Sequence, residues 1–187
     1  MSIEPHSDPR FYFRERLVAA TARHTTTLPP DVEAHLVSLL ARGAPEDSTH
    51  PTLVHQLHAA AGAAGPHARR AAFEATGDRA LYVVGFQGPH LARKGISPRY
   101  YASVGGRAYR QASGYGGAGR VTLRRLGEGF ARWARLLDTV REETALRTPQ
   151  DIVRLYDRYR RTGSSVLAER LREVGVYPQK PAPGTLH

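Results

Sequence analysis

The fold of this chain is decided by residues 121–145, which read VTLRRLGEGFARWARLLDTVREETA. Large apolar side chains recur there at alternating steps of three and four residues, as on one face of an α-helix. They are Leu123, Leu126, Phe130, Trp133, Leu137 and Val140. The spacing predicts a helix over 121–145 that buries this stripe in the core. A seam between two chains is the alternative, which Gly127 and Gly129 disfavour because each costs about 1 kcal/mol inside a helix.

The rest of the sequence also carries the start and stop signals of helices. Several prolines stand where a helix can begin, because proline has no N–H to leave unpaired in a first turn. Asp8, Ser97 and Thr148 directly precede three of them and are expected to be N-caps. Further helices are predicted at 9–24, 30–42, 51–64, 66–84, 98–113, 149–162 and 165–174. Within 98–113, Gly105 and Gly106 indicate the close approach of another backbone or a kink.

These patterns predict an all-α protein, since no alternating apolar run indicates a sheet. The 187 residues are 41% hydrophobic and 24% charged, which is ordinary for one soluble domain with a core of its own. We expect a single-domain helical bundle of about seven or eight helices packed on a central helix near 121–145. The domain is predicted to span 1–176, followed by a Pro-rich mobile tail at 177–187.

Composition excludes several kinds of chemistry. The chain has no cysteine, so disulfides, thiolate metal sites and thiol nucleophiles are absent. His55 and His58 lie three residues apart, but the glutamate of the zinc protease helix is missing, so we expect neither a metal site nor a cofactor. No nucleophile elbow or dinucleotide fingerprint is present, and no catalytic residue is predicted. No membrane span or targeting segment is seen, so a cytoplasmic location is expected.

The charge of the chain is concentrated in its middle. Residues 65–135 contain 13 basic and three acidic residues, and the resulting net charge of +10 equals the formal net charge of the whole chain. Glu74 and Asp78, two of those acids, are expected to pair with Arg70 and Arg79 on the same helix. A field of one sign attracts acidic surfaces and polyanions, so this segment is predicted to bind an acidic partner.

The predicted helices place the arginines of this segment on defined sides. Arg120, Arg124, Arg132 and Arg135 fall opposite the apolar stripe of 121–145, and Arg99, Arg107 and Arg110 share one side of 98–113. A glycine-rich connection at 114–119 lies between the two helices, where backbone N–H groups could meet an anion. The predicted anion-binding and partner-binding residues are Arg99, Arg107, Arg110, Tyr115, Gly116, Gly117, Arg120, Arg124, Arg132 and Arg135. The plain alternative is a solvated helix face with a simple connector.

Three classes of function remain open. The first is a non-enzymatic binding or regulatory module whose basic 65–135 segment docks an acidic macromolecule, either an acidic protein surface or nucleic acid. The second is a small-ligand-binding or catalytic helical bundle with a pocket near Tyr100, Tyr101 and the 114–119 glycine loop. The third is a structural assembly subunit that forms a homo-oligomer through the 121–145 stripe. The charge distribution favours the first.

Overall fold

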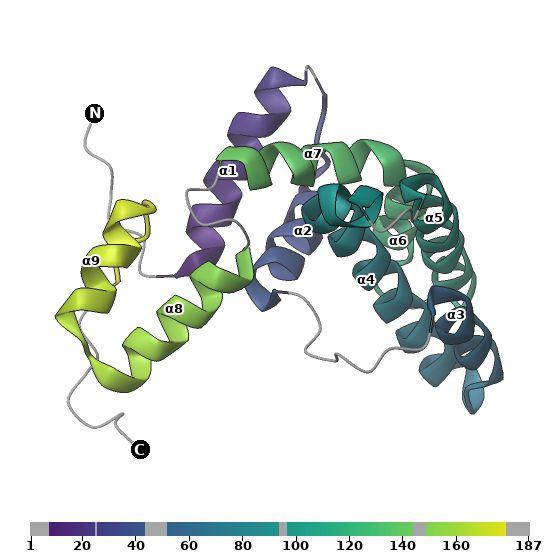
Figure 1. The fold of residues 1–187 in the computed structure, drawn as a ribbon. Helices are drawn as coiled ribbons and strands as arrows, with labels where there is room; N and C mark the ends of the chain where they lie inside the picture. The colour runs from purple at the N-terminus through teal and green to yellow at the C-terminus, as the bar shows by residue number, and fades with distance from the viewer. Residues whose placement is uncertain (1–7, 25, 44–51, 94–96, 144–148, 179–187) are drawn as a thin grey trace.

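The computed structural model describes residues 8–24, 26–43, 52–93, 97–143 and 149–178. All secondary structure in these residues is helical, which confirms the predicted all-α, single-domain bundle (Figure 1). None of these helices combines the length and the apolar character that crossing a bilayer requires. The helices are α1 (Pro9–Arg23), α2 (Pro30–Arg42), α3 (Leu53–Gly62), α4 (Gly65–Arg93), α5 (Pro98–Gly114), α6 (Arg120–Glu128), α7 (Phe130–Glu143), α8 (Pro149–Thr162) and α9 (Ser165–Glu173).

One of the three predicted N-caps makes a capping hydrogen bond in the described residues. The Asp8 side chain accepts a hydrogen bond from the Arg10 backbone N–H at 2.9 Å, as expected of an N-cap. Ser97 stands at the cap position of α5, but its side chain makes no capping bond. Thr148 lies outside the described residues, as does most of the predicted tail, 179–187.

Helix α4 is longer than the sequence predicts. The helix was predicted to end at residue 84, whereas it continues through Gly85 to Arg93. The glycine serves packing instead, because a Cβ atom placed at Gly85 would lie 2.6 Å from Cβ of Leu137 on α7. Gly85 therefore allows close contact between α4 and α7.

The predicted helix 121–145 is divided in two at Gly129. Helix α6 ends at Glu128 and α7 begins at Phe130, while residues 144–145 lie outside the described part. The carbonyl of Arg125 accepts both the Gly129 N–H at 2.9 Å and the indole N–H of Trp133 at 3.1 Å. A Cβ at Gly129 would lie 2.6 Å from that indole nitrogen, so only glycine leaves room for the ring. The whole apolar stripe is nevertheless buried, as predicted.

Helix α4 forms the middle of the larger part of the bundle. It packs most extensively on α5 and also contacts α7 and α3. Helix α1 lies against α2 and α7, and the α8–α9 pair is placed beside α1 and α2, away from α3 and α5 (Figure 1). Buried side chains from all these elements form one continuous hydrophobic cluster.

Glycines allow α4, α5 and α6 to approach closely. A Cβ at Gly105 of α5 would lie 2.6 Å from the Ala80 Cβ on α4 and would also collide with the Phe130 ring. A Cβ at Gly127 of α6 would lie 2.9 Å from the Gly106 carbonyl oxygen. The close backbone approach predicted from Gly105 and Gly106 is confirmed.

Truncation of Trp133, whose side chain is fully buried, tests the core assignment of the stripe. We expect Trp133→Ala to lower the free energy of unfolding by about 3–5 kcal/mol, since a large cavity is left and the indole bond to Arg125 is lost. Chemical denaturation followed by circular dichroism measures the change. A loss below about 1 kcal/mol would contradict the assignment.

The close approach of α4 and α5 is tested by adding one methyl group. Gly105→Ala should destabilise the protein by about 1–3 kcal/mol, because Ala80 and Phe130 must move to admit it. Gly114→Ala is the matched control, as nothing lies within 4 Å of its added Cβ. The control should be neutral or slightly stabilising in thermal unfolding, and equal effects at both positions would refute the argument.

Candidate functional site

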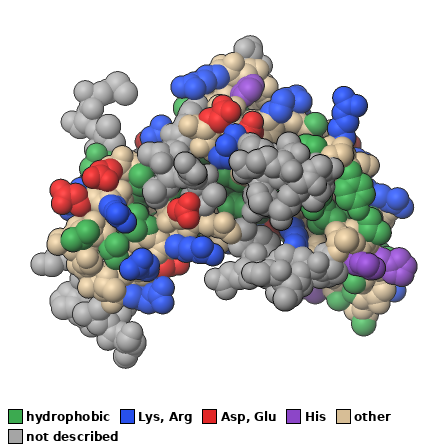
Figure 2. All heavy atoms as spheres, viewed as in Figure 1, with side chains coloured by type: hydrophobic (Ala, Val, Ile, Leu, Met, Phe, Trp, Pro, Cys, Tyr) green, Lys and Arg blue, Asp and Glu red, His purple; other side chains and the backbone are tan. Residues whose placement is uncertain are grey.

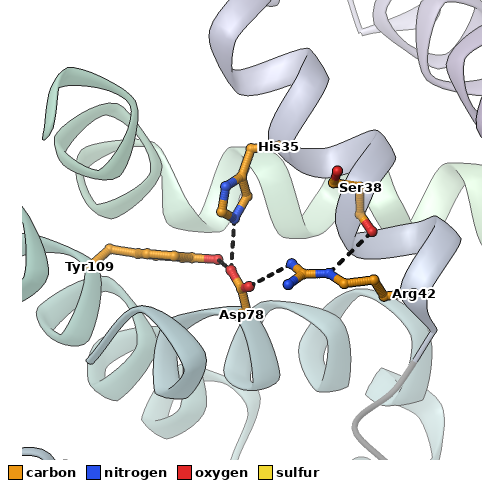
Figure 3. A network of polar contacts seen from close by, with 5 residues as sticks. All are labelled: His35, Ser38, Arg42, Asp78 and Tyr109. Atoms are coloured by element: carbon orange, nitrogen blue, oxygen red, sulfur yellow. Dashed lines mark hydrogen bonds and ion pairs between the residues drawn. The ribbon is translucent and has the colours of Figure 1, made fainter. Parts of the chain in front are cut away.

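The buried charged side chain of the middle segment is that of Asp78, which is 8% exposed. His35 Nε2 and the Tyr109 hydroxyl lie 2.7 Å from Oδ1, and a terminal guanidinium nitrogen of Arg42 lies 2.9 Å from Oδ2. Figure 3 shows these three side chains converging on Asp78 from α2 and α5. Arg42 Nε also donates to the Ser38 carbonyl at 3.3 Å. We call His35, Arg42, Asp78 and Tyr109 the Asp78 clamp.

The electrostatics of the clamp favour an ionised carboxylate. Burial alone raises the pKa of Asp78, but the hydrogen bonds and charges of His35, Tyr109 and Arg42 outweigh it, and the pKa lies below its usual value. Burial, together with the neighbouring Asp78 charge, raises the pKa of Tyr109 well above its ordinary range. The phenol therefore stays protonated and donates to the carboxylate.

The clamp is structural in its geometry. Three donors from the chain itself occupy the carboxylate, which joins α2, α4 and α5 at one point. The sequence predicted arginines of the same helix as partners of Asp78, whereas the structure pairs its carboxylate with Arg42 of α2. Helical spacing favours a local pair, but the Asp78 side chain is directed into the junction with the neighbouring helices.

The seven predicted arginines are all exposed, in agreement with the helical-wheel analysis. Three of them have neighbours. Arg110 donates to the Gly127 carbonyl at 3.2 Å, Arg124 approaches Glu128 at 4.0 Å, and Arg132 lies over the Trp133 ring, 4.2 Å from its centroid. The others have no side-chain partner among the described residues, and they are Arg99, Arg107, Arg120 and Arg135.

The glycine loop between α5 and α6 is held by a basic residue that the sequence did not assign to it. Gly116, Gly117 and Gly119 have positive φ angles, which glycine adopts without strain. The Arg70 guanidinium of α4 donates to the Ala118 carbonyl. A Cβ at Gly117 would lie 2.6 Å from a terminal nitrogen of this guanidinium. Binding of an anion by Gly116 and Gly117 stays a prediction, with Arg70 as an added cation beside them.

Four of the predicted site residues line two pockets that share no residue. Arg107 and Tyr115 line a pocket of about 300 Å³ between α3, α4 and α5. Arg132 and Arg135 line a smaller one of about 110 Å³ with residues at and after the end of α1. Tyr100 and Tyr101, around which the alternative small-ligand site was predicted, contribute to neither. The other residues of the larger pocket are Val54, Leu57, His58, Ala61, Phe73 and Gln111.

A groove of about 590 Å³ between α8 and α9 was not predicted. Arg154, Arg158 and Arg170 line it, but so do Asp151 and Glu173, so its charges largely offset one another. The sequence signal for it is the four-residue spacing of Arg154 and Arg158, which places both on one side of α8. Figure 2 shows acidic as well as basic side chains over this end of the molecule.

Comparison of the chain with protein-family models, curated proteins and solved structures found no match. Within the described part of the chain, no group of three or more His, Asp or Glu side chains is arranged to hold a metal ion.

The pH dependence of stability tests the Asp78 clamp. Because the folded pKa of Asp78 is lowered, its contribution is complete above the unfolded pKa of about 3.9 and is lost as the pH falls through the folded value. Asp78→Asn should therefore cost about 3 kcal/mol near neutral pH and progressively less below about pH 4. Denaturation across this range measures the difference.

Tyr109→Phe is the matched control for the charge. It removes one donor but leaves the Asp78–Arg42 ion pair, so its cost of about 1–2 kcal/mol should persist to lower pH than that of Asp78→Asn. A cost of Asp78→Asn that does not change with pH would show that folding does not lower the pKa of Asp78.

Proposed function

We propose that this protein is a non-enzymatic nucleic-acid-binding module whose basic 65–135 segment contacts the phosphate backbone. The observation that carries the proposal is the set of exposed arginines on α5, α6 and α7 that have no partner among the described residues. Arg107 stands on α5, Arg120 begins α6 and Arg135 lies on α7. An unpaired guanidinium group presents a fork of N–H donors that fits phosphate oxygens.

The absence of an apolar centre favours nucleic acid over an acidic protein. Interfaces between proteins have a core of apolar and aromatic side chains in which charged residues are depleted. Of the large hydrophobic residues that are exposed in the described part of the chain, only Tyr100 and Val121 fall between 65 and 135. A dispersed positive surface with little apolar area is suited to a phosphate backbone, where affinity comes from the release of counterions.

The contacts of the remaining arginines are compatible with this role. Arg110 donates to a carbonyl and Arg132 stacks on Trp133, so neither guanidinium is neutralised by a carboxylate in these contacts. The Arg124–Glu128 pair is exposed at 4.0 Å, and pairs of this kind contribute little. Each can therefore turn to a phosphate at small cost.

The proposal is tested by measuring the affinity for a short nucleic acid as a function of salt. If about five phosphates are contacted, log affinity should fall against log salt with a slope of about −4 to −5. A triple variant with Arg107, Arg120 and Arg135 each changed to Glu should lose most binding and keep its melting temperature, because exposed charges contribute little to stability.

The matched control carries the same change of charge on the other end of the chain. Arg158, Arg160 and Arg172 are exposed on α8 and α9 and are likewise changed to Glu. The control should bind nearly as well as the unchanged protein. Equal losses in both variants would assign binding to overall charge rather than to α5–α7, and no binding at low salt would overturn the proposal in favour of an acidic protein partner.

A further inference from the structure

The pocket between α3, α4 and α5 combines an apolar floor with a polar edge. Val54, Leu57 and Ala61 come from one side of α3. Phe73 of α4 and Tyr115, which follows α5, supply two aromatic rings. His58, Arg107 and Gln111 supply the polar groups. Figure 2 shows histidine side chains gathered over this end of the molecule, near exposed hydrophobic ones.

The aromatic pair gives the pocket a fixed flat wall. Phe73 is only 4% exposed, and its ring is stacked on that of Tyr115 with centroids 6.0 Å apart and an interplanar angle of 19°. Tyr115 is partly exposed and lines the pocket. The buried ring therefore supports the exposed one, which is then held ready to stack with a planar group.

The polar edge can bind both a base and a phosphate. Arg107 and Gln111 lie four residues apart on α5 and so project from the same side of the helix. Neither side chain has a partner among the described residues. The glutamine amide offers one acceptor and a pair of donors to the edge of a base, and the guanidinium offers a fork to the adjoining phosphate.

We propose that this pocket binds one unpaired nucleobase of a single-stranded nucleic acid. The base stacks on Tyr115, its edge bonds to Gln111, and its phosphate pairs with Arg107. A volume of about 300 Å³ lies at the lower end of the range of about 300–1,000 Å³ for small-molecule sites, which fits one base better than a larger group. Bases in a duplex are paired and stacked, so the pocket should favour single strands. This inference rests on the proposed function and specifies its substrate.

Filling the pocket without changing the charge is the most direct test. Ala61 lines the pocket and is exposed on α3, so Ala61→Trp should occlude it with little effect on folding. Ala59 is also exposed on α3 but does not line the pocket, and Ala59→Trp is the matched control. Affinities for an oligothymidine strand and for a duplex of equal length are measured at one salt concentration.

The unchanged protein should prefer the strand by about 5- to 150-fold, which is the range expected for stacking one base. Ala61→Trp should abolish the preference and leave duplex affinity unchanged, whereas Ala59→Trp should keep it. Tyr115→Leu should act like Ala61→Trp, with Tyr100→Leu as its control on an exposed tyrosine outside the pocket. Circular dichroism establishes whether each variant is folded. If Ala61→Trp does not fold, the comparison of Tyr115→Leu with Tyr100→Leu decides the outcome.

The outcomes separate this inference from the function on which it rests. If neither strand nor duplex binds at low salt, the proposed function fails and the nucleobase site fails with it. If both bind equally and neither pocket variant changes the ratio, the basic surface stands and the nucleobase site is overturned. A 2-aminopurine base in the strand gives an independent readout, since its fluorescence should be quenched on binding and the quenching lost in Tyr115→Leu.

Discussion

The ionised carboxylate of Asp78 is the interaction on which the arrangement of the middle helices depends. A buried charge is costly unless its hydrogen bonds are satisfied, and here three donors satisfy it. Helix α2 has only a narrow contact with α4, so His35 and Arg42 are its main polar attachment to that helix. Sliding α2 along α4 by one turn would break both of these bonds and leave the buried carboxylate with the Tyr109 hydroxyl alone, which fixes the register of the two helices.

The clamp in turn depends on how closely the helices approach. A Cβ at Gly77 would lie 2.7 Å from the Tyr109 ring, so the glycine next to Asp78 makes room for the side chain that donates to it. The His35 ring meets the Tyr109 ring edge-on, with centroids 5.9 Å apart. Small residues and a buried charge therefore act together, the first allowing α4 and α5 to come close and the second setting how they are aligned.

The sequence predicted the helices well because their signals are local. Apolar spacing and proline starts depend on neighbours within a few residues, and the bounds of α2 and α8 agree with the prediction. The Asp78 clamp was not predictable, since the partners of Asp78 lie 31, 36 and 43 residues away. Gly85 and Gly129 were ambiguous for the same reason. Whether a glycine ends a helix, bends it or admits a neighbour depends on what packs against it.

The candidate site shows the same division between local and distant information. The helical wheel correctly predicted that Arg107 is exposed. It could not show that α3 lies beside Arg107 and completes a pocket. Tyr109 lies between Arg107 and Gln111 in the chain, and a helix turns about 200° over two residues, so it projects to the opposite side. By binding Tyr109, the buried Asp78 carboxylate sets the rotation of α5 about its axis. That rotation directs Arg107 and Gln111 toward α3, so the clamp in the core determines the geometry of the pocket at the surface.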